Sequence, residues 1–258
     1  MAQPLAWQPQ LSGLFWTLVR TDFKTRYHGR LGGFVWALLK PLTMFLVLLA
    51  VFSLVFTTEP KYRLNLVIGI FLFDFFAEAT KTGFVSLGSK AFLLTKVKFP
   101  MWVVVVSSVA NAVITLGIVS LIILATLVMS GQSPAPAHLV LYGWYLLHYV
   151  IVAIGISFAA SVIFVRYRDL NQVWDVIIQA GFFLAPIVYP IGVIPERFHK
   201  FLYLWPPTPI IQFSRVVLVD GTVPTFKAHV LLTTFTLLIF AAGLGIFWRY
   251  SPRTAEHL

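Results

Sequence analysis

Three charged residues share one face of an otherwise apolar stretch and are the first candidates for chemistry. Asp74 and Glu78 are four residues apart and Lys81 follows three residues later, so a helix places all three on one side. Two neighbouring carboxyl groups can act as a general acid and a general base. If the stretch crosses a membrane, each charge costs about 2.5–3.5 kcal/mol at the centre, so this face must avoid lipid. We favour a Glu78–Lys81 ion pair, with a substrate contact as the alternative.

Motifs of other chemistries are missing from the sequence. It contains no phosphate-binding GxxxxGK[ST] loop, no HExxH motif and no cysteine, and its six histidines are scattered. We therefore expect no catalytic residue, no metal site and no bound cofactor on this chain.

The composition is typical of an integral membrane protein. Hydrophobic residues make up 59% of the 258 residues, charged residues only 11%, and the mean hydropathy is +0.88. Soluble proteins carry roughly 25% charged residues, so this chain has too few to cover a surface in water. The net charge of +10 therefore does not indicate a nucleic-acid partner.

Hydropathy predicts an all-α fold with six transmembrane helices in a single domain, residues 1–258. Residues 99–165 contain no Asp, Glu, Lys or Arg. This run suits two helices of about 20 residues each, separated by the proline-containing residues 130–138. The expected spans are residues 34–57, 64–84, 101–129, 139–165, 172–194 and 228–248.

A helix of another type is expected over residues 11–30, before the first span. Apolar residues recur there at helical spacing, and basic residues occupy the other side. This pattern is typical of a helix in the headgroup layer of a membrane, although a water-soluble helix that packs on the protein also has it.

The distribution of Lys and Arg predicts the orientation. If the N-terminus is inside, twelve Lys and Arg residues lie on the inner side and six on the outer side. Lys40, within the first span, is not counted. Both termini are therefore expected in the cytoplasm. Residues 195–224, on the outer side, are apolar and interrupted by prolines, which predicts a re-entrant hairpin between spans five and six.

Aromatic residues form 16% of the chain and cluster within two of the spans. Packing against lipid explains most of them, but a wall of flat apolar rings would also let sugar faces slide without binding tightly. The residues predicted to line such a pore are Trp36, Phe71, Asp74, Phe75, Glu78, Phe182, Phe183 and Tyr189.

Four segments carry a resemblance to a known family. They read LVRTDFKTRYHGRLGGFVWALLKP (18–41), FLLTKVKFP (92–100), VRYRDL (165–170) and APIVYP (185–190), the last followed by Ile194 and Pro195. In this order they resemble the N-terminal hallmark, the coupling segment, the inner turn before the fifth span and the outer hairpin of ABC type 2 exporter permeases. That family moves polysaccharides such as O-antigen, teichoic acid and capsule. The chain departs from its pattern at residues 205–207, which read WPP where Asn-Pro is usual.

The resemblance implies a homodimer with two cytoplasmic ATPase subunits, which would hold ATP and Mg. Residues 83–99 would form the cytoplasmic coupling segment. Its apolar residues 92–94 lie between lysines and would insert into a groove of the partner. Simple anchoring by positive charge is the alternative for these lysines. The residues expected to contact the ATPase are Lys90, Phe92, Leu93, Leu94, Lys96, Lys98, Phe99, Arg166, Arg168 and Asp169.

The resemblance also implies a lipid-linked substrate taken up at the inner leaflet. Residues of the first helix are expected to attract its lipid diphosphate, although ordinary anionic membrane lipids would be attracted as well. They are Arg20, Lys24, Arg26, Tyr27 and Arg30.

The function implied is that of a permease subunit in an ATP-driven exporter of a lipid-linked polysaccharide of the O-antigen type, multi-pass in a bacterial inner membrane. One alternative is a same-family exporter of capsule, teichoic acid, a small lipid or a drug. Another is a membrane enzyme acting on polyprenyl-linked sugars, for which Asp74 and Glu78 are the only acid/base candidates.

Overall fold

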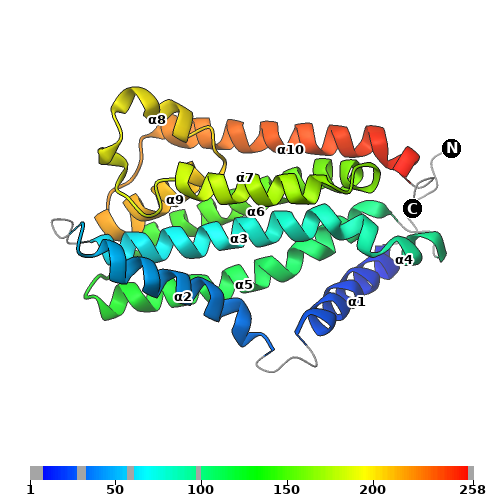
Figure 1. Cartoon of the computed structure of the whole chain (residues 1–258), viewed down its shortest axis with the longest axis horizontal. Coiled ribbons are helices and arrows are strands. Elements are labelled where there is room, and N and C mark those ends of the chain that lie inside the picture. Colours follow the sequence, from blue (N-terminus) through cyan, green and yellow to red (C-terminus); the bar gives the residue numbers. More distant parts are fainter. Residues whose placement is uncertain (1–7, 28–32, 57–60, 97–99, 255–258) are drawn as a thin grey trace.

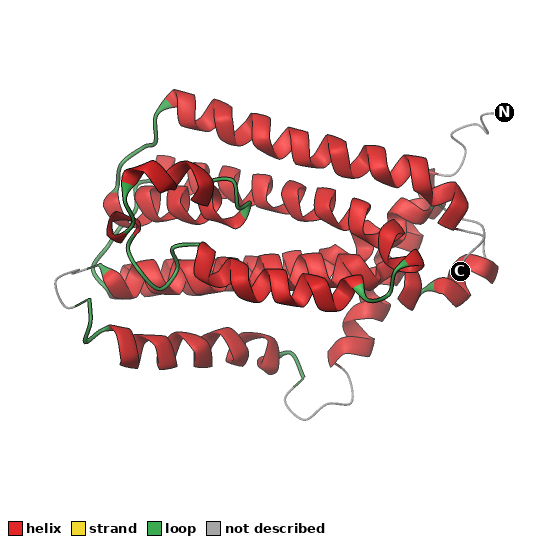
Figure 2. Ribbon diagram, turned by 45° about the horizontal axis from the view of Figure 1, so that its top comes forward, coloured by secondary structure: helices red, strands yellow, loops and turns green. Residues whose placement is uncertain are grey.

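The computed structural model describes residues 8–27, 33–56, 61–96 and 100–254, and all regular structure in these ranges is helical (Figure 2). The long helices form an elongated bundle, and α1 (Gln8–Tyr27) lies inclined against one end of it (Figure 1). The remaining elements are α2 (Val35–Phe52), α3 (Tyr62–Ser89), α4 (Ala91–Lys96), α5 (Met101–Met129), α6 (Pro136–Arg166), α7 (Leu170–Leu184), the 3-10 turn η1 (Ile191–Val193), α8 (Glu196–Leu202), α9 (Pro207–Arg215), the π-helical turn η2 (Val216–Asp220) and α10 (Phe226–Thr254).

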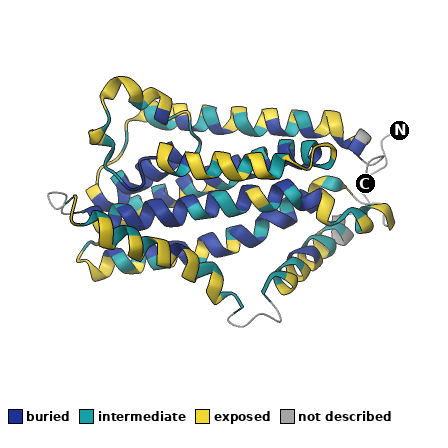
Figure 3. Cartoon of the chain, viewed as in Figure 1, coloured by how far each residue is buried: buried dark blue, intermediate teal, exposed yellow. Residues whose placement is uncertain are grey.

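Helix α3 forms the centre of the core. It is buried over most of its length (Figure 3), because α5 and α6 pack along it and α2, α7 and α9 cover its remaining sides. Aromatic rings fill this core, with Phe76 stacked on Tyr149 of α6 at a centroid distance of 5.8 Å. Any charge on α3 is therefore placed beside a packed apolar interior.

Small residues let α6 approach its two main neighbours closely. A Cβ atom on Gly243 of α10 would lie 1.9 Å from the carbonyl oxygen of Gly155. A Cβ atom on Gly83 of α3 would lie 2.0 Å from Oγ of Ser157. Helices in membranes associate through such close packing, since lipid chains provide no hydrophobic driving force between them.

Among the described residues, α2, α5, α6 and α10 are long and apolar enough to cross a membrane. Helix α3 has 28 residues and the necessary length, but it carries the charged residues of the second expected span. Helix α7 has 15 residues, about 22 Å at 1.5 Å per residue, and is shorter than the hydrocarbon layer of about 30 Å. The chain is thus an all-helical membrane protein.

The fifth expected span, residues 172–194, is not one continuous helix. Helix α7 ends at Leu184, and Ala185 is extended with φ −70° and ψ 130°. Pro186 explains the break, because proline disfavours the helical conformation of the residue before it. Residues 185–190 continue as irregular chain, and this segment is buried as far as Val188.

The expected outer hairpin, residues 195–224, contains α8, α9 and η2. Helix α8 is largely exposed, whereas α9 is buried against α3 and α6. The turn η2 is ended by Gly221, whose φ of +64° is a left-handed conformation that glycine adopts without strain.

The close approach of α6 and α10 makes a testable prediction. We expect Gly243→Ala to lower the midpoint of thermal unfolding in mild detergent, because the new Cβ atom meets the backbone of α6. Gly245→Ala is the matched control, since a Cβ atom there meets nothing within 4 Å and alanine favours helix by about 1 kcal/mol. Equal midpoints for the two variants would contradict the close packing.

Candidate functional site

The charged face of α3 is paired with three other helices. Lys40 of α2 donates to Oδ1 of Asp74 over 2.8 Å, and Arg26 of α1 donates to Glu78. Lys81 donates to Oδ1 and Oδ2 of Asp175 on α7, over 2.6 and 2.8 Å. Each charge of the face thus finds a partner on a different element.

The expected Glu78–Lys81 ion pair is therefore wrong. Both residues lie on one face of α3, but each forms its ion pair with another helix, Arg26 of α1 or Asp175 of α7. Each carboxylate of α3 is thus neutralised by its own cation, Glu78 by Arg26 and Asp74 by Lys40. A carboxylate held in an ion pair is a poor general acid or base. The ion pairs also tie three helices to the core.

The three ion pairs surround a cavity of about 590 Å³ along the C-terminal half of α3. Its wall includes the rings of Tyr27 and Trp36 and the amide of Asn171. The Oδ1 atom of Asn171 is buried and has no hydrogen-bond partner among the described residues. The cavity thus combines equal numbers of positive and negative groups with aromatic rings and a free acceptor.

A second cavity, of about 670 Å³, continues from the first along α3. The two share wall residues from α2, α3 and α7, among them Trp36, Asp74 and Ile178. The second is predominantly apolar, and its further wall includes Phe73 of α3 and Phe182 of α7. We call the two together the amphipathic groove.

The eight predicted pore residues occupy three different places. Five of them line the amphipathic groove: Trp36, Asp74, Glu78, Phe182 and Phe183. Phe71 and Phe75 are only 2% and 4% exposed and pack inside the core, because they lie on other faces of α3. They line no surface of this protomer. Tyr189 lies beyond α7 and donates its hydroxyl to the carbonyl of Phe183 over 2.8 Å.

The expected coupling segment, residues 83–99, starts within α3, whose last turns it forms up to Ser89, and continues in α4. Phe92 of α4 is 77% exposed, and Leu93 and Leu94 are half-buried. Lys96 lies near Phe92, with Nζ 5.7 Å from the ring centroid. The structure thus presents an apolar ring on a short helix at one end of the bundle (Figure 1). Lys98 and Phe99 lie outside the described residues.

Lys90 points back into the protein. It is the residue between α3 and α4, and its Nζ atom donates to Oδ2 of Asp22 over 2.5 Å and to Oγ of Ser108 over 2.9 Å. Asp22 and Arg26 lie one turn apart on α1, so two ion pairs attach this helix to α3. The expected role of Lys90 at the ATPase surface does not match its inward contact.

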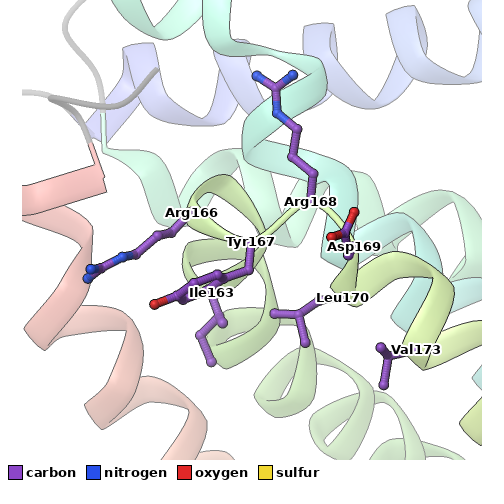
Figure 4. Close-up of a pocket in the computed structure, with 7 residues that line it drawn as sticks. All are labelled: Ile163, Arg166, Tyr167, Arg168, Asp169, Leu170 and Val173. Atoms are coloured by element: carbon purple, nitrogen blue, oxygen red, sulfur yellow. The ribbon is translucent and has the colours of Figure 1, made fainter.

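The turn between α6 and α7 forms an open recess of about 640 Å³ at the same end (Figure 4). Arg166, Arg168 and Asp169 line it and are exposed, as the predicted contact with a partner requires. Arg166 lies 5.4 Å from the ring centroid of Tyr167. This recess and α4 therefore form two exposed features at one end of the bundle.

The predicted lipid-attracting residues of the first helix are not equivalent. Arg20 and Lys24 are exposed, whereas Arg26 is paired with Glu78. Tyr27 packs its ring against Phe34, with a centroid distance of 5.2 Å. Arg30 lies outside the described residues.

Sequence reasoning missed the partners of the α3 face. Lys40 is the only charged residue in the expected first span, and Asp175 is the only one in the expected fifth span. These single charges were a usable signal, because a charge within a membrane span almost always finds a partner.

Sequence reasoning also missed Arg215, which is 6% exposed at the end of α9. Its guanidinium donates to the carbonyls of Asn65, Pro186 and Ile187 over 2.9, 2.5 and 3.0 Å. Pro186 and Ile187 belong to the irregular chain after α7, whose carbonyls no helix satisfies. Arg215 thus holds the outer segment against the start of α3.

Comparison with known proteins gives consistent matches over nearly the whole chain. A sequence profile of the ABC-2 type transporter family matches residues 13–219. The chain is 26% identical over 256 residues to the O-antigen export system permease protein RfbA of Myxococcus xanthus, and 28% identical over 250 residues to that of Klebsiella pneumoniae. Both alignments cover 96% of each chain. The polysialic acid transport protein KpsM of Escherichia coli is 22% identical over 233 residues, 88% of this chain and 89% of its own.

The attachment of α1 can be tested by charge reversal. Arg26→Glu and Glu78→Arg should each lower the free energy of unfolding by about 1–3 kcal/mol, since each leaves a half-buried charge beside a like charge. The double variant should recover part of the loss, because it restores opposite charges. Lys24→Glu, an exposed charge on the same helix, serves as the control. Additive losses in the double variant, measured by thermal unfolding in mild detergent, would rule the pair out.

Proposed function

The chain belongs to the ABC-2 type transporter family, and from this premise we propose that it is the permease subunit of an ATP-driven exporter of a lipid-linked polysaccharide, of the O-antigen type. The supporting observation is the similarity over 96% of the chain to two proteins named O-antigen export permeases. The similarity to a polysialic acid transport protein supports the wider class of polysaccharide export. The chain is a multi-pass protein of the bacterial inner membrane.

The proposed topology has six spans, with α3 and α7 crossing alongside the four more apolar helices. Helix α7 alone is too short, and the irregular residues 185–190 complete its crossing within the protein. The start of α1 and the end of α10 lie at the end of the bundle that carries α4 (Figure 1). Together with the excess of basic residues at that end, this arrangement supports a cytoplasmic position for both termini. Residues 195–224 would form the re-entrant hairpin on the outer side.

The proposed assembly is a homodimer with two ATPase subunits, which supply ATP and Mg. Helices α2 and α7 lie on one side of α3, and each buries a single residue, Pro41 or Gly181 (Figure 3). Their remaining apolar surface needs lipid or protein to cover it. A second copy facing these helices would place the amphipathic groove beside the interface and the proposed pore.

Coupling would begin at the exposed ring of Phe92 and the recess between α6 and α7. A protruding aromatic side chain beside charged residues is typical of an energetically important protein contact. A push on α4 would reach α1 through the Lys90–Asp22 pair and α3 directly. In this role the chain itself makes and breaks no covalent bond.

Two other functions are less well supported. The first is an exporter of capsule, teichoic acid, a small lipid or a drug. Such an exporter would have the same family architecture, so a transport assay is needed to identify the substrate. A membrane enzyme would need Asp74 and Glu78 as an acid/base pair, but each carboxylate is held by its own cation from another helix.

Affinity purification of the tagged chain from its native membranes in mild detergent tests the proposal. We expect a co-purifying ATPase subunit in a near-equimolar amount and ATP hydrolysis by the complex. A chain that purifies alone, under conditions that preserve related complexes, would contradict the exporter function.

The coupling contact can be tested with Phe92→Asp. This variant should remain in the membrane but lose at least about tenfold of the coupled ATPase activity, because a carboxylate replaces the apolar ring at the proposed contact. Phe226→Asp is the matched control, since Phe226 is 83% exposed at the start of α10, at the opposite end of the bundle. Equal ATPase activity in the two variants would remove α4 from the contact.

A further inference from the structure

Three successive carbonyl groups of the irregular chain after α7 accept hydrogen bonds from side chains of other elements. Arg215 of α9 donates to the carbonyl of Pro186 over 2.5 Å and to that of Ile187 over 3.0 Å. Tyr62 of α3 donates its hydroxyl to the carbonyl of Val188 over 2.8 Å. A buried carbonyl group that lacks a donor costs about 1–3 kcal/mol. These side chains therefore fix the chain at the end of α7 to α3 and α9.

Gly69 of α3 leaves the space that the Arg215 guanidinium occupies. A Cβ atom on Gly69 would lie 2.4 Å from Nη2 of Arg215 and 3.0 Å from Cγ2 of Ile187. One turn earlier on α3, the carbonyl of Asn65 accepts a hydrogen bond from Nε of Arg215 over 2.9 Å. Arg215 is buried and forms no ion pair with the carboxylates of the described residues, so neutral carbonyl groups alone hold its charge. The guanidinium is thus enclosed between α3 and the chain after α7.

A second glycine receives Trp205, two residues before α9 begins. A Cβ atom on Gly181 of α7 would lie 2.3 Å from Cζ2 of the Trp205 ring. The same ring packs edge-to-face with Phe76 of α3, at a centroid distance of 5.8 Å. Trp205 belongs to the WPP sequence at which the chain departs from the family pattern. Both ends of α9 are therefore joined to α3 and to the end of α7, and we call the Gly69–Arg215 and Gly181–Trp205 contacts the glycine clamp.

The start of α7 is held less firmly than its end. Gly181, in the last turn, is the only residue of α7 that is buried. Near the start, the Lys81–Asp175 ion pair joins side chains that are 51% and 46% exposed, and an exposed pair of this kind contributes about 0–1 kcal/mol. Trp174 stacks on Phe84 of α3 at a centroid distance of 4.9 Å, but Trp174 remains partly exposed. Contacts of this kind break at a lower cost than the buried clamp.

We propose that the glycine clamp is a fixed pivot, about which the start of α7 swings during transport while the end of α7 stays on α3. Arg215 and Trp205 are then positioning residues of the transport cycle, and α9 belongs to the part that does not move. This inference rests on the proposed export function and adds to it which end of α7 moves. It also gives a role to the buried cation of Arg215, which no other part of the proposed mechanism uses.

The length of α7 makes this swing large enough to break contacts. From Gly181 to Leu170, eleven residues span about 16 Å at 1.5 Å per residue, so a tilt of about 10° displaces the start of α7 by roughly 3 Å. Such a displacement separates Lys81 from Asp175, whose hydrogen bonds are 2.6 and 2.8 Å long. The start of α7 also borders the recess at residues 166–169, the second proposed contact of the ATPase. A push at this recess would therefore act on the moving end of α7.

Cysteine crosslinking of the complete complex in nanodiscs tests the pivot, because the chain itself contains no cysteine. One pair, Gly181→Cys with Trp205→Cys, joins α7 to the hairpin at the clamp. The other pair, Trp174→Cys with Phe84→Cys, joins the start of α7 to α3. A short bismaleimide should reduce the coupled ATPase activity of the second pair at least about tenfold, because the start of α7 can no longer move. It should leave the first pair at least as active as before treatment, because the link replaces a contact that stays closed.

Each pair is compared with itself before crosslinking, so the effect of the substitutions cancels. Loss of activity on crosslinking the clamp pair would show that this contact opens during transport, and would overturn the proposal. Full activity after crosslinking at the start of α7 would overturn it as well.

The Arg215 contact is tested with Gly69→Ala, which keeps the charge and every donor but places a Cβ atom where the guanidinium lies. With a loose pivot, a push shifts α7 as a whole instead of tilting it. We therefore expect surface polysaccharide in the native host to fall about tenfold at an unchanged ATPase activity of the purified complex. Gly117→Ala of α5 is the matched control, since a Cβ atom there meets nothing within 4 Å. Arg215→Lys, which keeps the charge but has a single donor nitrogen, should uncouple the two activities in the same way.

The results also separate the pivot from the export function. Equal ratios of export to ATPase activity in Gly69→Ala and Gly117→Ala would overturn the pivot. A parallel fall of both activities in Gly69→Ala and Arg215→Lys would also overturn it, because the contact would then only support the fold. In each case the unaltered chain would still export. Absence of an ATPase subunit from the purified chain would instead refute the export function, and the pivot with it.

Discussion

The charged face of α3 is the constraint on which the arrangement of the other helices depends. Asp74, Glu78 and Lys81 belong to a helix that is otherwise packed into an apolar core. Asp74 and Glu78 are mostly buried there, and an unpaired charge on either costs several kcal/mol, so each of these carboxylates requires a partner. The partners come from three other elements: Arg26 of α1, Lys40 of α2 and Asp175 of α7. The ion pairs thereby decide where these elements lie.

The molecule is held together by two kinds of contact with different consequences. Helices α3, α5, α6 and α10 are joined by close packing around small residues such as Gly155 and Gly243, and packing of this kind does not slide without creating voids. Helices α2 and α7 each bury only one residue fully, pack a single apolar face against the core, and add ion pairs to α3. Such side chains can exchange partners. In the proposed exporter, the first group is suited to remain rigid and the second to move.

The sequence was sufficient for the parts of the fold that depend on composition and local conformation. Charge-free runs located the apolar helices, and Pro186 is the local cause of the break within the fifth expected span. The four family-like segments by themselves indicated the function. These features could be predicted because hydropathy and proline act over one or two helical turns.

The sequence was insufficient where the answer depends on which helices meet. Glu78 and Lys81 are close in sequence, yet their partners lie on α1 and α7. Phe71 and Phe75 share a cluster with Phe73, but only Phe73 reaches the groove, because helical rotation turns the others into the core. A helix that is apolar on all sides has no periodic hydropathy pattern, so its sequence does not show which face packs into the core. Only the packed structure shows it.

The position of α1 suggests how energy from a partner would reach the groove. Its Asp22 is tied to Lys90, beside the coupling helix α4, and its Arg26 is tied to Glu78 in the wall of the groove. The same helix therefore contacts both the residue that precedes α4 and the wall of the groove. A displacement of α4 that carried α1 with it would pull on Glu78 and alter the charge balance around the groove. Two ion pairs one turn apart on α1 thus connect the start of α4 with the wall of the groove.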